Sequence, residues 1–179
     1  MLTKENAVLL VVDVQGKLAQ LMHEKEKLFK NLKIMVKGAK ILQVPIIWLE
    51  QNPDGLGPTI PELAGLLKNQ QSISKFGFSC CQNDEFSAAL KAVKRKQIVL
   101  TGIETHICIY QTARDLLAKG YGVEVVADAV SSRTLANKHI ALEKISKAGG
   151  IISSTEMVLF ELLQVAEGEQ FKGILRLVK

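Results

Sequence analysis

The feature that most constrains the fold is an unbroken apolar run near the start of the chain, Ala7–Val12, which reads AVLLVV. A strand with one wet face alternates apolar and polar residues, whereas a strand of a parallel sheet covered by helices on both faces is apolar throughout. The run therefore predicts a central parallel strand. Asp13 follows directly, at the strand end where open α/β sheets place their ligands. The same residue could equally cap the next turn or helix, and this segment alone does not separate the two roles.

Five further strands are expected, over 45–49, 72–75, 97–101, 123–127 and 150–152. They alternate with segments of helical periodicity over 17–42, 61–68, 84–94, 105–119, 135–148 and from 153 or 154 to 163. The proline-rich stretch 51–61 predicts a loop, and the tail 171–179 is read as a short helix or an edge segment. This alternation predicts an α/β fold with three α/β/α layers and a mostly parallel, Rossmann-like sheet. A length of 179 residues suits one domain over 1–179.

A candidate nucleophile lies in the segment Lys96–Ala113, KQIVLTGIETHICIYQTA. After the strand over 97–101, Gly102 is expected to break the strand, and Cys108 then falls in the first turn or two of a helix. The amino end of a helix carries partial positive charge and free N–H groups, so it is expected to lower the pKa of a thiol and to bind an oxyanion. The competing interpretation is a packing role, because cysteine is among the most buried residue types.

Lys75 is the third candidate, because it lies between apolar neighbours in a stretch poor in charge. A lone lysine is usually solvated, but Asp13, Lys75 and Cys108 would each lie at the carboxyl end of a parallel strand, and these ends face one crevice. Together they make a coherent chemistry. The Cys108 thiolate attacks an electrophilic carbon, Asp13 takes the proton, and Lys75 keeps Asp13 ionised. Backbone N–H groups near Glu104 and Cys108 would form the oxyanion hole.

Composition argues against several other classes of protein. The net charge of +5 comes from scattered lysines, and aromatic residues make up 5% of the chain, so a solvated helix face is expected and a nucleic-acid surface is not. Three cysteines do not make a disulfide framework, which suggests the cytoplasm. The start of the chain does not read as a signal peptide, and no apolar stretch is long enough to span a bilayer, so no membrane partner is expected.

The sequence resembles the isochorismatase-like cysteine hydrolases, which include nicotinamidases and N-carbamoylsarcosine amidohydrolases. The resemblance covers essentially the whole chain and is carried by four motifs: Val11–Gln15, Lys75–Gly77, Gly102–Cys108 with Gln111–Ala113, and Asp128–Arg133. It implies a sheet of order 3-2-1-4-5-6 and a catalytic triad of Asp13, Lys75 and Cys108. It also implies a cis peptide bond between Ile103 and Glu104 that aims an N–H into the oxyanion hole, and assembly into dimers or larger homo-oligomers.

Within that family the chain looks closest to the short, metal-free members. Nicotinamidases carry a metal site built from an aspartate and two histidines after the second strand, whereas Trp48–Pro53 contains no histidine here. The three histidines, His23, His106 and His139, lie far apart in the sequence, so neither a metal nor another cofactor is expected. A nicotinamidase assignment is correspondingly disfavoured.

The substrate expected from these residues is a small molecule with an amide or carbamoyl C–N bond. Isochorismate hydrolysis is an ether cleavage that need not use the cysteine, so the presence of Cys108 favours a thioester route. The candidates for lining the substrate pocket are Gln51, Phe76, Phe78, Ile103 and Tyr110. Two alternatives stay open: a vinyl-ether hydrolase of an isochorismate-like substrate, and a protein that keeps the fold but works through binding or oligomer contacts.

Overall fold

The computed structural model describes residues 1–179 and contains one six-stranded sheet in the order β3-β2-β1-β4-β5-β6, with every neighbouring pair parallel. This confirms the predicted fold class and strand order. The strands are β1 (Ala7–Val12), β2 (Ile46–Gln51), β3 (Ile73–Lys75), β4 (Gln97–Ile103), β5 (Gly122–Ser131) and β6 (Ile151–Ser153).

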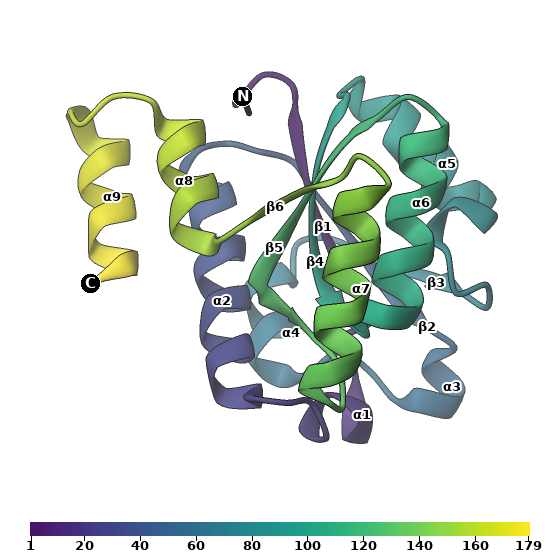
Figure 1. The fold of residues 1–179 in the computed structure, drawn as a ribbon. Coiled ribbons are helices and arrows are strands. Elements are labelled where there is room, and N and C mark those ends of the chain that lie inside the picture. The colour runs from purple at the N-terminus through teal and green to yellow at the C-terminus, as the bar shows by residue number, and fades with distance from the viewer.

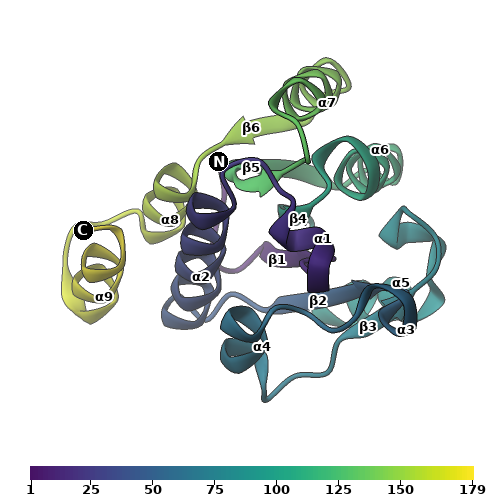
Figure 2. The same ribbon diagram turned by 90° about the horizontal axis from the view of Figure 1, so that it is seen from below.

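Helices cover both faces of the sheet (Figures 1 and 2). One face carries α2 (Lys25–Ile41), α4 (Pro61–Leu67) and α8 (Thr155–Leu163), with α9 (Gly168–Val178) packed outside α2 and α8. The other face carries α5 (Asp84–Val93), α6 (Tyr110–Ala118) and α7 (Leu135–Lys147). Four short elements lie in the connections: α1 (Gly16–Gln20), α3 (Pro53–Leu56), a 3-10 turn η1 (Cys80–Gln82) and a π-helical turn η2 (Thr105–Ile109).

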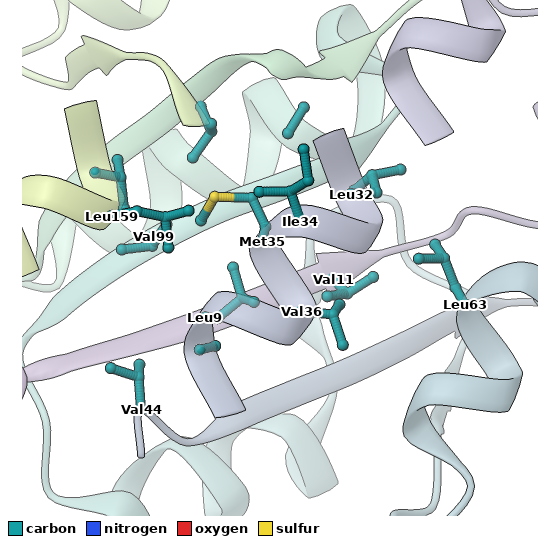
Figure 3. Close-up of a cluster of buried hydrophobic side chains, with 14 of the residues drawn as sticks. Leu9, Val11, Leu32, Ile34, Met35, Val36, Val44, Leu63, Val99 and Leu159 are labelled. Atoms are coloured by element: carbon teal, nitrogen blue, oxygen red, sulfur yellow. The ribbon is translucent and has the colours of Figure 1, made fainter. Parts of the chain in front are cut away.

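The apolar run of β1 is explained by the two hydrophobic cores that the sheet separates. Leu9 and Val11 point into the core beneath α2, shown in Figure 3, while Val8, Leu10 and Val12 point into the core beneath α5, α6 and α7. All six residues of the strand are buried. Burying a leucine or valine side chain contributes about 1.5–3 kcal/mol, so both faces of this strand stabilise the fold.

Several element ends differ from the sequence-based expectation. The segment expected as one helix over 17–42 is two, because Glu24 adopts a left-handed conformation (φ 51°) and the amide of His23 bonds the carbonyl of Ser132. The loop over 51–61 contains the short helix α3, and the tail is a helix that begins earlier, at Gly168. β5 runs on to Ser131 because the ladder between β4 and β5 shifts register after Leu100.

Gly102 does not break a strand, contrary to expectation, but lies inside β4. Its φ is +119°, and a Cβ atom at this position would stand 2.0 Å from the carbonyl oxygen of Val12 on β1. A glycine is needed here because β1 and β4 approach too closely for any side chain. The strand therefore continues to Ile103 and delivers the next residues to the edge of the sheet where Asp13 lies.

Candidate active site

Three elements bring Asp13, Lys75 and Cys108 to the carboxyl edge of the sheet. Asp13 follows β1 directly, where it takes a left-handed conformation with φ of 56°. Lys75 is the last residue of β3 and pairs in register with Gln51 of β2. Cys108 lies in η2, which begins two residues after β4 ends. The structure thus brings together the three residues that the sequence singled out.

Lys75 and Asp13 form a buried ion pair, with 2.7 Å between Nζ and Oδ2. The ammonium also donates to Oε1 of Gln51 at 2.7 Å and to the carbonyls of Gly77 and Phe78 at 3.2 Å. Four acceptors therefore surround a group with three N–H donors. This arrangement suits a fixed positive charge and leaves no place for a lone pair, so Lys75 is not arranged as a proton carrier.

The second carboxylate oxygen of Asp13 is the unusual atom of the site. Oδ1 is buried and has no hydrogen-bond partner, although buried polar atoms in proteins nearly always have one. Burial raises the pKa of Asp13, and the ammonium of Lys75 opposes that rise. Asp13 therefore offers one oxygen held by Lys75 and a second oxygen that can accept a proton.

The Cys108 thiol does not have the lowered pKa that the sequence suggested. Burial raises the pKa of the thiol well above its ordinary range, and the negative charge of Asp13 raises it further. The side chain is only 7% exposed and lies in η2, ahead of the regular helix α6. Desolvation outweighs the favourable field of the helix end. A thiol whose pKa is raised in this way needs a base as it attacks.

Two glutamines, whose role could not be seen in the sequence, hold the lysine in place. Gln15 is fully buried, and its Nε2 donates to the carbonyls of Gln51 (3.0 Å) and Gly57 (2.8 Å) while its Oε1 accepts from the amide of Gln51 (2.6 Å). Gln51 in turn bonds Lys75 through Oε1 and the carbonyl of Phe76 through Nε2. Gln15 lies inside the Val11–Gln15 motif, but a motif does not reveal which backbone groups its side chain meets.

Glu104 connects the cysteine segment to the end of β5. Its Oε1 accepts from the backbone amide of Arg133 at 3.0 Å and from the Arg133 guanidinium at 3.1 Å. A second link joins Nδ1 of His106 to the hydroxyl of Ser132 over 2.9 Å. The peptide bond between Ile103 and Glu104 is cis.

A cavity of about 120 Å³ opens beside the thiol. Its lining residues are Asp13, Leu18, Gln51, Leu56, Phe78, Ile103, Glu104, Ile107 and Cys108. Gln51, Phe78 and Ile103 were among the residues expected to line a pocket, whereas Leu18, Leu56 and Ile107 were not. The latter come from α1, α3 and η2, elements too short for their placement to be inferred from periodicity.

Two of the expected pocket residues lie elsewhere. Phe76 follows β3 and is 76% exposed. Tyr110 begins α6 and faces α7, where the ammonium of Lys144 stands 4.6 Å from its ring centre and Arg114 donates to its hydroxyl. Neither residue lines the cavity.

Neither a cluster of metal ligands nor a membrane-spanning helix is present. No three side chains among His, Cys, Asp and Glu are grouped as a metal site requires. His23 and His139 line a different cavity, and His106 is bonded to Ser132. None of the helices has the length and apolar character needed to cross a bilayer.

Comparison with known proteins places this geometry in context. The family model of the isochorismatase domain matches residues 7–157. The secreted isochorismatase effector Isc1 of Phytophthora sojae is 37% identical over 99% of this chain and 87% of its own length.

Two solved structures are similar over nearly the whole chain. The MAR1 ribonuclease of Caenorhabditis elegans superposes with a TM-score of 0.93 at 34% identity, covering 99% of this chain and 91% of that one. The second structure is the YcaC gene product of Escherichia coli, described as an octameric hydrolase of unknown specificity. It superposes with a TM-score of 0.93 at 28% identity, covering 98% of this chain and 88% of that one.

Proposed function

This chain belongs to the isochorismatase-domain family of hydrolases, and from that premise we propose that it is a cysteine-dependent hydrolase of a small amide or carbamoyl C–N bond. The observation that carries the proposal is that the buried Cys108 thiol and the Asp13 carboxylate, whose Oδ1 is not held by Lys75, line the same cavity. A nucleophile of this kind requires an adjacent base, and Asp13 supplies one. Lys75 fixes the orientation of that base by holding its other oxygen.

The first half of the reaction forms a thioester. As Sγ of Cys108 bonds to the substrate carbonyl carbon, the thiol proton passes to Oδ1 of Asp13 and the carbonyl oxygen becomes an oxyanion. Backbone N–H groups of Glu104 and Cys108 stabilise this oxyanion, as fixed donors do in acyl-transfer enzymes. The C–N bond then breaks, the proton on Asp13 moves to the departing nitrogen, and a thioester remains on Cys108.

The second half returns the enzyme to its starting state. Asp13 takes a proton from a water molecule as the water oxygen attacks the thioester carbonyl, and the C–S bond breaks when the tetrahedral species collapses. The proton on Asp13 returns to the sulfur, and a carboxylic acid is released. Lys75 remains an ammonium throughout, since its four acceptors leave no role for it in the proton transfers.

The size of the cavity favours a small substrate over the other candidates. Pockets for drug-sized ligands usually measure about 300–1,000 Å³, whereas this cavity holds about 120 Å³. The C. elegans relative is named a ribonuclease, but a nucleotide would not fit this space without rearrangement. A vinyl-ether hydrolase has no need of the thiol, and a binding module has no need of an unpartnered carboxylate oxygen beside it.

The test is ammonia release from a panel of nicotinamide, carbamoyl amino acids and short aliphatic amides. Wild type should release ammonia from at least one member, and Cys108→Ala should release none. Cys81→Ala, which removes a thiol outside the cavity, is the matched control and should retain activity. Equal release by wild type and Cys108→Ala would refute the cysteine mechanism, and turnover of a vinyl ether alone would favour ether hydrolysis.

We further propose that the chain forms a homo-oligomer in the cytoplasm. The E. coli relative is described as octameric, and here Leu135 and Ile140 of α7, Ile151 of β6 and Met157 of α8 leave large apolar side chains exposed. Three free thiols suit a reducing compartment. Light scattering should give a multiple of 19.7 kDa; a monomer at micromolar concentration would refute assembly.

A further inference from the structure

No lysine or arginine side chain lines the cavity. The Lys75 ammonium behind the wall already has four acceptors from the protein itself. Arg133 bonds Glu104 through Nε, and its side chain is 54% exposed and lies outside the cavity lining. A substrate carboxylate that entered the cavity would therefore find no cation in the wall, and it would lie near the carboxylates of Asp13 and Glu104.

The remaining cavity wall is largely apolar, and the hydrogen-bond donors assigned to it, the backbone N–H groups of the proposed oxyanion hole, carry no charge. Leu18, Leu56, Phe78, Ile103 and Ile107 supply hydrocarbon. The amide group of Gln51 accepts from Lys75 through Oε1 and donates one of its two Nε2 N–H groups to the carbonyl of Phe76, so it can offer a ligand one uncharged N–H. The acceptor beside the Cys108 thiol is Oδ1 of Asp13, which has no other hydrogen-bond donor in the protein.

We propose that the substrate is an uncharged primary amide with a short aliphatic acyl group, and that carboxylate-bearing amides such as carbamoyl amino acids are excluded. This inference rests on the proposed function and narrows it. The amide N–H groups meet the free acceptor, and the acyl chain meets the apolar walls. The cavity volume of about 120 Å³ suits a short acyl chain. Burying a carboxylate here without a partner would be strongly unfavourable.

A test independent of turnover compares two alkylating reagents of nearly equal shape, neutral iodoacetamide and anionic iodoacetate. Mass spectrometry gives the rate at which Cys108 reacts with each reagent, and the rate with iodoacetamide is divided by the rate with iodoacetate. This ratio is then divided by the corresponding ratio for free N-acetylcysteine, which gives the quotient of interest. We expect the quotient to exceed roughly tenfold, because an unpaired buried charge costs at least that factor. A quotient near one would overturn the proposal.

Variants that add a cation to the cavity should weaken the preference of Cys108 for iodoacetamide. Leu56→Lys introduces an ammonium at the wall, so iodoacetate should gain on iodoacetamide and the quotient should fall towards one. Leu21→Lys is the matched control, since Leu21 is 62% exposed, lies just after α1 and does not line the cavity. Leu18→Lys serves as the second variant if Leu56→Lys does not fold. An unchanged quotient in a folded cavity variant would contradict the proposal.

A turnover experiment separates this inference from the proposed function. The value of kcat/KM for isobutyramide should exceed that for malonamate, a carboxylate of similar size, by roughly 100-fold. Equal values would overturn the substrate class and leave the hydrolase intact. Selective alkylation without turnover of any amide would refute amide hydrolysis and support the exclusion of charged ligands.

Discussion

The ammonium of Lys75 has more hydrogen-bond acceptors around it than protons to donate. If the ammonium were removed, the carboxylate of Asp13, the side-chain carbonyl of Gln51 and two backbone carbonyls would all lose their donor inside the protein. Breaking a buried ion pair from one side usually costs more than the pair itself contributes, because a charge is left without compensation.

Lys75→Met should therefore destabilise the protein as well as inactivate it. We expect a loss of about 3–5 kcal/mol in the free energy of unfolding, measured by urea denaturation. Lys147→Met is the control, because it breaks the exposed pair with Glu143 and should change the free energy by less than about 0.5 kcal/mol. Equal urea midpoints for Lys75→Met and wild type would show that the pair does not stabilise the fold.

The alkylation of Cys108 should depend on the ionisation of Asp13. The pKa of Asp13 is raised, so the base is lost on acidification at a higher pH than for an ordinary aspartate, and the rate of alkylation should fall there. Asp13→Asn should slow alkylation of Cys108 by roughly 100-fold, the lower range for a lost general base. The rate is followed by mass spectrometry of the peptide that contains Cys108.

Cys81 is the internal reference for this experiment. Burial raises its pKa to about 11, so its alkylation should simply increase with pH and should not respond to Asp13→Asn. If Cys108 reacts at the same rate in wild type and Asp13→Asn, then Asp13 is not the base.

The residues proposed to perform chemistry were easier to predict than the residues that hold them. Asp13, Lys75 and Cys108 were proposed because each was expected at the carboxyl end of a parallel strand and because the sequence resembles a family with such a triad. The hydrogen bonds of the Gln15 side chain were not predicted, because they join it to backbone groups about forty residues away along the chain. The sign of the shift in the pKa of Cys108 was also missed, because burial depends on the whole fold.

Among the elements, β4 shows how one residue type decides whether the site can form. Its approach to β1 leaves no room for a Cβ at Gly102, whose nearest neighbours would be backbone atoms of Val12 that cannot turn aside. The strand delivers Glu104 and Cys108 beyond this point of contact. A side chain at position 102 would therefore displace β4 from β1 and would also move Glu104 and Cys108.

Gly102→Ala should lower the free energy of unfolding by roughly 3 kcal/mol, in the range typical of severe backbone clashes. Gly65→Ala provides the opposite case, because Gly65 lies in α4 with open space around its Cβ position. Alanine favours a helix over glycine by about 1 kcal/mol, so this variant should be slightly stabilised. Similar melting temperatures for the two variants would contradict the close approach.

Element types were predicted better than element ends. Strand positions followed from apolar runs, but the break before α2 depends on the left-handed Glu24, and the extension of β5 depends on a register shift opposite β4. The tail alternates apolar and basic residues, and it becomes a helix because Ile174 is buried against the core beneath α2. Each difference arises from a tertiary contact that no local pattern contains.

For the whole molecule, the sheet has a hydrophobic core on each of its two faces, and this arrangement explains why the fold could be predicted from the sequence. A strand that is apolar throughout and a sixfold alternation with helices leave few arrangements open. The same burial also affects the ionisation of a group far from the site. Glu124, on β5, is 5% exposed, and burial followed by the charge of Glu161 raises the pKa of its carboxyl.

A raised pKa in the folded state means that the fold disfavours the ionised form of Glu124. Its contribution to stability is therefore greatest at low pH and is lost as pH rises through the raised pKa. Glu124→Gln should melt on the order of 2–4 °C higher than wild type at pH 7, the shift produced by about 1 kcal/mol in a chain of this size.

The difference in melting temperature between Glu124→Gln and wild type should disappear on acidification, once Glu124 is protonated in wild type. Calorimetry at several pH values measures this difference. Glu143→Gln is the control of opposite sign, because Lys147 lowers the pKa of Glu143, so its loss should slightly reduce the melting temperature at pH 7. A gain for Glu124→Gln that is independent of pH would contradict the raised pKa.

The carbonyls that surround the Lys75 ammonium have a consequence for redesign of this enzyme. Two of them belong to Gly77 and Phe78, and Phe78 lines the cavity, so the ammonium of Lys75 also holds one wall of the cavity in place. That wall cannot be remodelled without displacing the charge. The cavity is also lined by three residues that do not bond the ammonium: Leu18, Leu56 and Ile107. Engineering of variants for bulkier or charged substrates should therefore randomise those three positions and leave residues 75–78 unchanged.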